Sequence, residues 1–340
     1  MPTSSRAISA AWMGSMPGRC AVLPEEHITL HAGALTVTLH PAIGGCLGSF
    51  LWQHPDGRQV PLLRTMSAGA ANSESAACFP LIPFSNRIRH GRLTFEGRSI
   101  SLPRNTSGQH VEHGHGWQRP WSLQKVTDLH ATIGFTHDPE QDATWPFAYA
   151  AEQDVALDKD GLTVTLRARN TGARPMPIGF GLHPYFLRTP LCRLQAIVEG
   201  FWETDTEVLP TRHVAVPEAF DLRRGLAMNN VVIDNCFTGF GGQAVIDWPE
   251  FDSRLIMTAE RPLRFLTLCA RCGGCGGGSG GRHRALFLRR ARQQYHRRRQ
   301  SADGRSRPQR AGTGRGDKCQ RAIPADRALE VREPSLVAMT

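Results

Sequence analysis

The stretch Leu35-Thr36-Val37-Thr38-Leu39 alternates apolar and polar residues with a period of two, and the pattern returns in Leu162-Thr163-Val164-Thr165-Leu166. Because successive side chains of a β-strand point to opposite faces, this alternation predicts strands with one buried face. Turn signals occur at four dipeptides, namely Gly44-Gly45, Glu96-Gly97, Asp160-Gly161 and Gly241-Gly242. No stretch shows an amphipathic helix stripe, so we expect an all-β fold, a large antiparallel sandwich or barrel.

Composition divides the chain into three regions. Residues 1–26 lack the apolar run of a secretory signal, and we expect an N-terminal extension without fixed structure. Residues 27–270 carry the strand patterns and form one β domain. Residues 271–340 are rich in Arg and Gly and poor in apolar residues. Such a segment buries too little surface to offset its conformational entropy, so its composition predicts a disordered tail.

The positive charge of the protein is concentrated in this tail. The 340 residues have a formal net charge of +10. Residues 271–340 contain 17 Lys and Arg against five Asp and Glu, whereas residues 1–270 contain 23 against 25. The body is nearly neutral and therefore gives no reason to expect a nucleic-acid partner. Nucleic-acid binding stays an alternative for the tail alone, which has little aromatic interleaving beyond Tyr295 and no recognised module.

Cysteine usage and hydropathy bear on the compartment. The nine cysteines are an odd number without even spacing, which disfavours a disulfide framework and predicts the reducing cytoplasm. No stretch approaches the roughly 20 apolar residues of a membrane helix, so we expect no membrane partner. The cysteines at 269, 272 and 275 and the histidines at 110, 113 and 115 do not follow a strong metal-binding pattern, and we expect no metal.

Two apolar stretches contain polar residues suited to catalysis or ligand binding. His183 lies in Gly179-Phe180-Gly181-Leu182-His183-Pro184-Tyr185-Phe186, which indicates a buried strand broken at Pro184. Imidazole has the unperturbed pKa nearest neutrality, so His183 is a candidate proton donor, although a hydrogen-bonded core histidine gives the same pattern. Asn86 and Arg87 follow the proline-braced stretch 79–84. A guanidinium there offers a rigid fork of donors to a polar ligand, or else lies on a solvated loop.

Two further segments add candidate ligand contacts. Gln109-His110-Val111-Glu112-His113-Gly114-His115-Gly116-Trp117 places glycines among histidines. The glycines favour close approach of the backbone to a ligand, and Trp117 offers an apolar face suited to a sugar ring. Asp234 follows the apolar residues 231–233, either as a turn former or as an acceptor for ligand hydroxyls.

Four segments together resemble the aldose 1-epimerase (mutarotase) family in order and spacing. They are FPLIPFSNRIRHGRLTFEG from Phe79, HVEHGHGWQRPW from His110, NTGARPMPIGFGLHPYF from Asn170 and DNCFTGF from Asp234. The resemblance covers roughly residues 27–268. It implies a large antiparallel β-sandwich of the galactose mutarotase type, a free aldohexose such as galactose or glucose as substrate, and chemistry without a metal or cofactor.

The resemblance also implies a role for each candidate residue. His183 matches the general acid that protonates the ring oxygen of the pyranose, and His113 matches a histidine that hydrogen-bonds the sugar near that oxygen. Asn86 and Arg87 match a pair that binds sugar hydroxyls. Asp234 matches the carboxylate that holds hydroxyls further round the ring. The implied reaction is interconversion of α and β anomers by acid and base ring opening.

The general base is where this chain departs from the family, which supplies it from a Glu in a late Glu-Pro-Val-Ser segment. No such segment is in frame, and Glu333-Pro334-Ser335 echoes it close to the end of the chain without a strand pattern before it. Codons for residues 290–296 can be chosen so that reading one base later gives Glu-Pro-Val-Ser-Asn-Ile. We therefore hypothesise a frame shift near residue 270. The chain is then an epimerase, inactive as written if the base is missing, or a non-catalytic carbohydrate-binding protein of the same fold.

Overall fold

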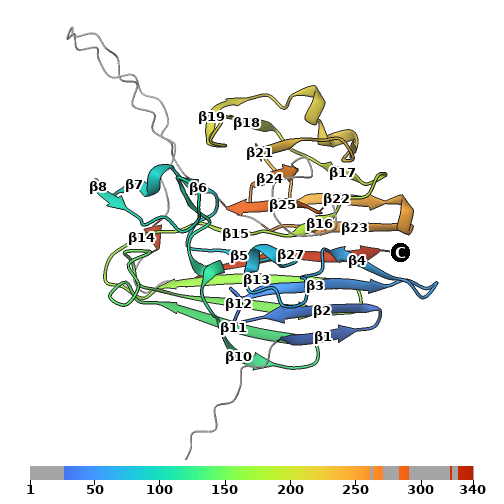
Figure 1. Cartoon of the computed structure of the whole chain (residues 1–340), viewed down its shortest axis with the longest axis horizontal. Helices are drawn as coiled ribbons and strands as arrows, with labels where there is room; N and C mark the ends of the chain where they lie inside the picture. The colour runs from blue at the N-terminus through green and yellow to red at the C-terminus, as the bar shows by residue number, and fades with distance from the viewer. Residues whose placement is uncertain (1–26, 261–262, 271–282, 291–321, 324–327, 340) are drawn as a thin grey trace, which may run out of the picture.

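The computed structural model describes residues 27–260, 263–270, 283–290, 322–323 and 328–339 (Figure 1). Within these ranges the regular structure is β-strand interrupted by short 3-10 turns, and none of it is α-helix. The strands pair antiparallel in two large sheets and several small ones. The predicted all-β class is confirmed.

The largest sheet has nine strands in the order β10-β11-β12-β13-β27-β23-β22-β17-β20. Its strands are β10 (Ser122–Val126), β11 (His130–His137), β12 (Tyr149–Leu157), β13 (Gly161–Asn170), β27 (Ala328–Met339), β23 (Ser253–Thr258), β22 (Gln243–Trp248), β17 (Arg193–Ala196) and β20 (Leu226–Ala227). Leu162, Val164 and Leu166 of β13 are all buried, as their alternation predicts.

A second sheet of eight strands runs in the order β19-β18-β21-β24-β25-β15-β5, with β16 paired to β25 beside this path. Its strands are β19 (Pro210–Val214), β18 (Gly200–Thr204), β21 (Ile233–Thr238), β24 (Phe265–Ala270), β25 (His283–Arg290), β15 (Phe180–Leu182), β16 (Tyr185–Leu187) and β5 (Pro80–Leu81). Only His183 and Pro184 separate β15 from β16. Proline has no N–H to donate to a ladder, so the strand is interrupted at the histidine.

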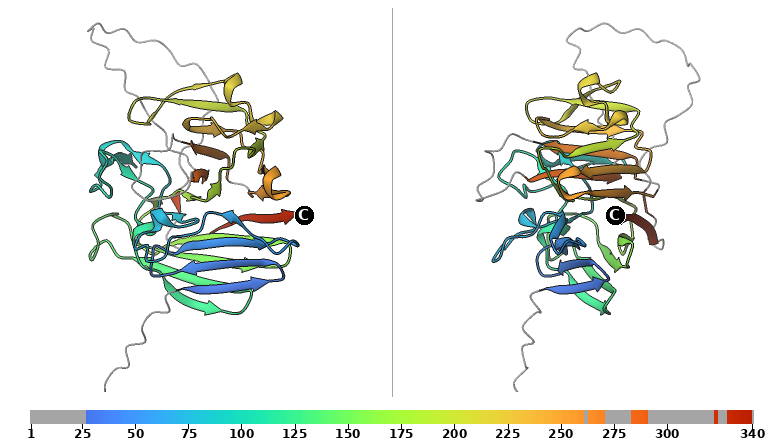
Figure 2. Two further views of the ribbon diagram at one scale, coloured as in Figure 1. Left: turned by 45° about the vertical axis from the view of Figure 1, so that its right-hand side comes forward. Right: turned by 90° about the vertical axis from the view of Figure 1, so that its right-hand side faces the viewer.

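A four-stranded sheet packs on the nine-stranded one through contacts of β1 and β2 with β12 (Figures 1 and 2). It consists of β1 (Ile28–Ala32), β2 (Leu35–His40), β3 (Cys46–Gln53) and β4 (Gln59–Leu63). Leu35, Val37 and Leu39 of β2 are at most 2% exposed. Full burial of such a side chain stabilises the fold by about 1.5–3 kcal/mol, so this face holds the two sheets together.

Small elements complete the architecture. The short strand pairs are β6 (Arg87–Ile88) with β9 (Val111–Glu112), β7 (Arg92–Phe95) with β8 (Arg98–Ser101), and β14 (Met176–Pro177) with β26 (Ala322–Ile323). The 3-10 turns are η1 (Ser73–Ser75), η2 (Arg89–Gly91), η3 (Gly116–Gln118), η4 (Glu218–Phe220), η5 (Leu222–Arg224) and η6 (Pro249–Phe251). The predicted turn at Glu96-Gly97 joins β7 to β8 with φ of 48° and 75°. Positive φ at both residues is what a two-residue hairpin of this type requires.

Three described segments lie beyond residue 270, and all three are strands. β25 lies between β24 and β15, β26 pairs with β14, and β27 lies between β13 and β23. Composition predicts no packed structure here. For these segments the prediction of disorder is wrong. Their backbone forms ladder hydrogen bonds with strands that would otherwise be sheet edges. The remainder of 271–340 and all of 1–26 lie outside the described residues, so the domain boundaries stay a prediction. No helix in the described part of the chain has the length and hydropathy to span a membrane.

Candidate functional site

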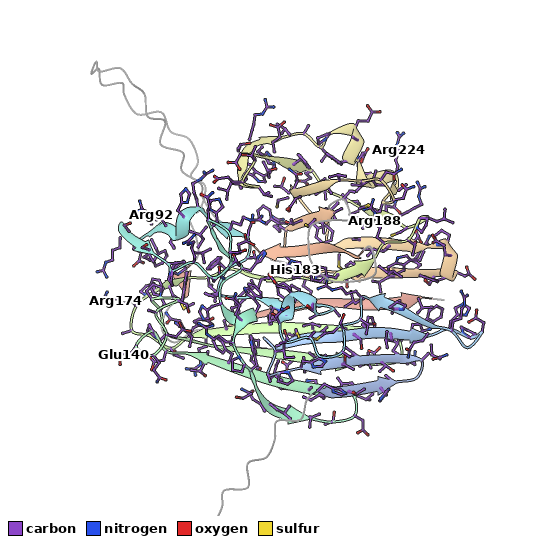
Figure 3. The ribbon with its side chains drawn as sticks, in the orientation of Figure 1. Arg92, Glu140, Arg174, His183, Arg188 and Arg224 are labelled. Carbon is purple, nitrogen blue, oxygen red and sulfur yellow. The ribbon has the colours of Figure 1, made fainter. Side chains whose placement is uncertain are left out.

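His183 packs against two aromatic rings at the break between β15 and β16, in the interior of the molecule (Figure 3). Its ring centroid lies 4.4 Å from that of Phe79 and 4.6 Å from that of Tyr185, with interplanar angles of 25° and 29°. Its backbone N–H donates to the Phe79 carbonyl oxygen at 3.0 Å. The Phe79 and Tyr185 centroids lie 6.2 Å from each other, so the two rings do not cover opposite faces of the imidazole. Together they fix the plane of the His183 ring.

Arg64 holds the Tyr185 ring in place. Its guanidinium carbon lies 3.4 Å from the centroid of the Tyr185 ring, and its Nε donates to the Ala76 carbonyl oxygen at 2.6 Å. Burial raises the pKa of the Tyr185 hydroxyl, so the phenol stays protonated at neutral pH. The stack is therefore a rigid support for the His183 ring.

His113 lies edge to face with His183, at 5.5 Å between ring centroids and an interplanar angle of 89°. The backbone N–H of Asn86 donates to His113 Nδ1 at 3.0 Å, and the backbone N–H of His113 donates to the Asn86 carbonyl oxygen at 2.8 Å. A backbone N–H is always the donor, so Nδ1 is the acceptor and the neutral ring carries its proton on Nε2. His113 is therefore set up as a hydrogen-bond donor through Nε2.

The backbone around these two residues is unusual. Asn86 has φ of 72°, His113 has φ of 61° and Gly114 has φ of 70°. A residue with a Cβ costs about 1–2 kcal/mol in the left-handed region. Strain of this kind concentrates at functional sites, where surrounding contacts hold it in place.

Gly114 allows the histidine segment to approach β5 and the residues after it. A Cβ at Gly114 would lie 2.1 Å from the Ile82 carbonyl oxygen. We therefore expect Gly114→Ala to lower the free energy of unfolding by about 1–3 kcal/mol or more, because it adds a clash to backbone strain. Gly97→Ala is the matched control, since Gly97 has φ of 75° with nothing within 4 Å of its would-be Cβ. Equal losses in urea unfolding of the two variants would remove the argument from close approach.

Arg87 lies next to Asn86 on β6, which pairs with β9 so that Arg87 faces Glu112. Its Nε donates to Glu112 Oε1 at 3.0 Å, and the Arg87 side chain is 17% exposed. A half-buried ion pair fixes the plane of the guanidinium more firmly than a solvated arginine would be fixed. Asn86, Arg87, His113 and His183 are thus brought together by the β6–β9 pair and the β15–β16 break.

Asp234 belongs to the same sheet but lies further across it. It pairs with Cys269 of β24, Cys269 pairs with Ala285 of β25, and Ala285 pairs with Tyr185 of β16. Three strand spacings place Asp234 about 14 Å from Tyr185 along this row. The carboxylate can therefore reach only the far side of a ligand whose near side touches His183.

The three neighbouring histidines diverge to different partners. His110 Nδ1 accepts from the His90 N–H at 3.2 Å, and His115 Nε2 bonds the Tyr149 hydroxyl at 3.1 Å. No group of three His, Cys, Asp or Glu side chains in the described ranges has the arrangement to hold a metal ion. The histidine run thus serves three separate local structures.

Burial lowers the pKa of His115 to about 3, with a smaller contribution from His137. The unfolded histidine titrates near 6.5, so below that pH the unfolded chain gains a proton that the folded chain refuses. We expect this site to remove about 1.4 kcal/mol of stability per pH unit as pH falls from 6.5 toward 3. In urea titrations at successive pH values, His115→Gln should flatten the pH dependence of the free energy of unfolding. His31→Gln, at an exposed position, should leave that dependence unchanged. Parallel curves for wild type and His115→Gln would contradict this.

A cavity of about 330 Å³ lies beside the site and is lined by polar residues, aliphatic residues and one indole. Its lining includes Asn72, Ser73, Glu74, Asn105, Trp117 and Gln118, and none of the five predicted site residues. Trp117, expected to offer a face to a sugar ring, is 5% exposed and stacks on Phe79 at 5.4 Å. That stacked face packs inside the protein.

Sequence reasoning gave no role to three residues, for two reasons. Phe79 and Tyr185 stand inside the quoted motifs, but only the fold shows that both of their rings stack on His183. Glu112 stands between two histidines, and its bond to Arg87 depends on the pairing of two short strands. Strand register across a long loop leaves no readable signal in one sequence.

Comparison with known proteins assigns the chain to a family. The family model of aldose 1-epimerases matches residues 26–269. The chain belongs to the aldose 1-epimerase family, a family of sugar isomerases.

Individual proteins are similar to this chain in sequence or in fold. The uncharacterized protein YphB of Escherichia coli K12 is 31% identical over 236 residues, which is 69% of this chain and 77% of that protein. The crystal structure of a candidate aldose 1-epimerase from Escherichia coli K12 is 26% identical, with a TM-score of 0.77 over 92% of this chain and 98% of that one. A galactose mutarotase-like protein from Clostridium acetobutylicum shares the fold at 17% identity, with a TM-score of 0.74 over 92% of this chain and 95% of its own.

Proposed function

We propose that the protein interconverts the α and β anomers of free aldohexoses such as galactose and glucose. The observation that carries the proposal is the pairing of two histidines, one packed against the rings of Phe79 and Tyr185 and the other oriented by the Asn86 N–H. Their ring centroids lie 5.5 Å apart. One imidazole is thereby positioned to give a proton, and the other is positioned to orient the acceptor through its Nε2–H.

The reaction is a pair of opposed proton transfers. A base takes the proton of the C1 hydroxyl while His183 gives a proton to the ring oxygen, and the bond between C1 and that oxygen breaks to leave an aldehyde. Rotation about the C1–C2 bond presents the other face of the aldehyde. Closure returns the proton from the ring hydroxyl to His183 and gives the C1 oxygen the proton held by the base. The cycle needs no redox partner, cofactor or metal.

The other candidates bind rather than transfer protons. His113 donates through Nε2 near the ring oxygen, and Asn86 with Arg87 binds neighbouring hydroxyls. Asp234 accepts from hydroxyls on the far side of the ring. Hydrogen bonds of this kind to charged groups contribute about 1.5–3 kcal/mol each, enough to orient a small sugar.

The base is not among these residues. Glu250 is engaged elsewhere, where its carboxylate accepts from the Thr189 hydroxyl at 2.9 Å and from the Leu191 N–H at 2.6 Å. Glu333 belongs to β27 of the nine-stranded sheet, whereas His183 lies between β15 and β16 of the eight-stranded sheet. A Glu read one base later would fall near residue 290, where β25 ends beside β15. This placement supports a frame shift as the reason the base is missing.

A missing base leaves a second candidate function, a carbohydrate-binding protein without catalysis. Polarimetry of freshly dissolved α-galactose, combined with calorimetric binding, separates the two. An epimerase speeds the decay of optical rotation in proportion to protein concentration. Decay at the buffer rate with measurable binding would instead establish the binding protein, and decay at the buffer rate without binding would reject both.

We also propose the cytoplasm as the compartment of the enzyme. Among the described cysteines, Cys46 and Cys192 are free thiols. Free thiols persist where glutathione and thioredoxin keep them reduced.

A further inference from the structure

One side chain, that of Asn105, holds the backbone on both sides of His113. Its Nδ2 donates to the carbonyl oxygens of Glu112 and Gly114, each at 2.7 Å. Its Oδ1 accepts from the backbone N–H of Glu112 at 2.9 Å. An asparagine amide has two N–H donors and one carbonyl oxygen, so every polar atom of this side chain is used on the histidine segment.

This segment requires such a clamp. His113 and Gly114 have φ of 61° and 70° in succession, and a residue with a Cβ prefers to leave that region. Asn105 bridges this bend, because its two N–H donors bond the carbonyl oxygens of the residues before and after His113. Gln118 steadies the clamp from outside, with Nε2 donating to the Asn105 carbonyl oxygen at 2.7 Å.

The clamp reaches two predicted sugar contacts at once. The orientation of His113 decides whether its Nδ1 can accept from the Asn86 N–H at 3.0 Å. The position of Glu112 decides where its carboxylate meets Arg87 Nε at 3.0 Å. Both residues take their backbone position from the same amide.

We propose that Asn105 is the positioning residue of the sugar site. It acts through the backbone of Glu112–Gly114, setting the direction of His113 Nε2–H and the plane of the Arg87 guanidinium. The inference rests on the proposed role of His113 in sugar binding. A displacement of about 1 Å in such a group can lower the reaction rate by about 100-fold.

The test uses the full chain with ¹⁵N-labelled histidine, the His113 signal being assigned from its loss in His113→Gln. In the wild type we expect neutral His113 in one tautomer, with the proton on Nε2. In Asn105→Ala we expect a mixture of both tautomers, because the Asn86 N–H no longer meets Nδ1 squarely. Galactose affinity, measured by calorimetry, should fall about 10- to 100-fold.

Asn170→Ala is the matched control. Asn170 is fully buried and clamps another loop, donating to the Arg174 carbonyl oxygen at 2.7 Å and accepting from the Gly172 N–H at 2.9 Å. The Asn170→Ala variant should be less stable than the wild type, with no change in the His113 tautomer or in galactose affinity. Asn105→Asp, which keeps the acceptor and removes both donors, serves as a second variant if Asn105→Ala fails to fold.

The two proposals fail in different ways. A single Nε2–H tautomer in folded Asn105 variants would overturn the positioning role, whatever the enzyme does. A tautomer mixture in a chain whose wild type neither binds nor isomerises sugars would leave the positioning of His113 intact and reject the proposed function.

Discussion

A chain with Glu-Pro-Val-Ser at residues 290–293 should exchange the anomers of galactose about 10²- to 10⁴-fold faster than the present chain, which is the usual contribution of a general base. The substitutions are Arg290→Glu, Ala291→Pro, Arg292→Val and Gln293→Ser. Arg290 is the last residue of β25 and pairs with Phe180 of β15. That position lies three residues, or about 10 Å along a strand, before His183. A carboxylate introduced there comes to the strand beside the proposed acid.

The control chain carries Arg290→Gln with the same three neighbouring substitutions, so its backbone matches and only the base differs. Polarimetry of α-galactose measures the rate of anomer exchange for both chains. Equal rates in the two chains would mean that a glutamate at this place does not act as the base. Resequencing the gene tests the origin of the loss, since a reading frame intact through codon 340 would remove the frame-shift hypothesis.

Replacing His183 by glutamine should lower the exchange rate of the base-restored chain by a similar factor, about 10²- to 10⁴-fold. Glutamine donates a hydrogen bond but does not transfer a proton at neutral pH. The Phe79 and Tyr185 rings remain to hold the flat amide, so galactose affinity should change by only a few-fold. Rate and affinity are measured separately, by polarimetry and by calorimetry.

His137→Gln is the matched control for removing a buried imidazole. His137 is 3% exposed, and its Nε2 bonds the Trp145 carbonyl oxygen at 2.7 Å. Its loss should reduce stability while leaving the rate per folded molecule unchanged. An exchange rate that survives in His183→Gln would show that some other group protonates the ring oxygen.

Local patterns predicted the parts of this fold that local physics determines. The alternation at 35–39 and 162–166 predicted buried strand faces, and Glu96-Gly97 predicted a hairpin turn, because strand period and positive φ are properties of a few adjacent residues. The break at Pro184 was readable for the same reason. The positions of β25 and β27 were not readable, since pairing with strands far away in the chain depends on which edges are left open.

The residues of the site were likewise only partly predictable from the sequence. His183, His113, Asn86 and Arg87 stand in motifs whose order points to a sugar isomerase. The clamp by Asn105 is invisible in sequence, because an asparagine in a loop is ordinary and only the bend at His113 makes its three hydrogen bonds matter. Trp117 had the right chemistry for a sugar platform, yet packing on Phe79 occupies one face of its ring.

The most direct test is a crystal structure of the protein with galactose bound. We predict the pyranose at the edge of the His183 ring, with its ring oxygen about 2.7–3.2 Å from an imidazole nitrogen and with Arg87 and His113 Nε2 on adjacent oxygens. Galactose seated instead in the cavity lined by Asn72, Glu74 and Trp117, with the His183 edge facing only water, would contradict the proposed site and its chemistry.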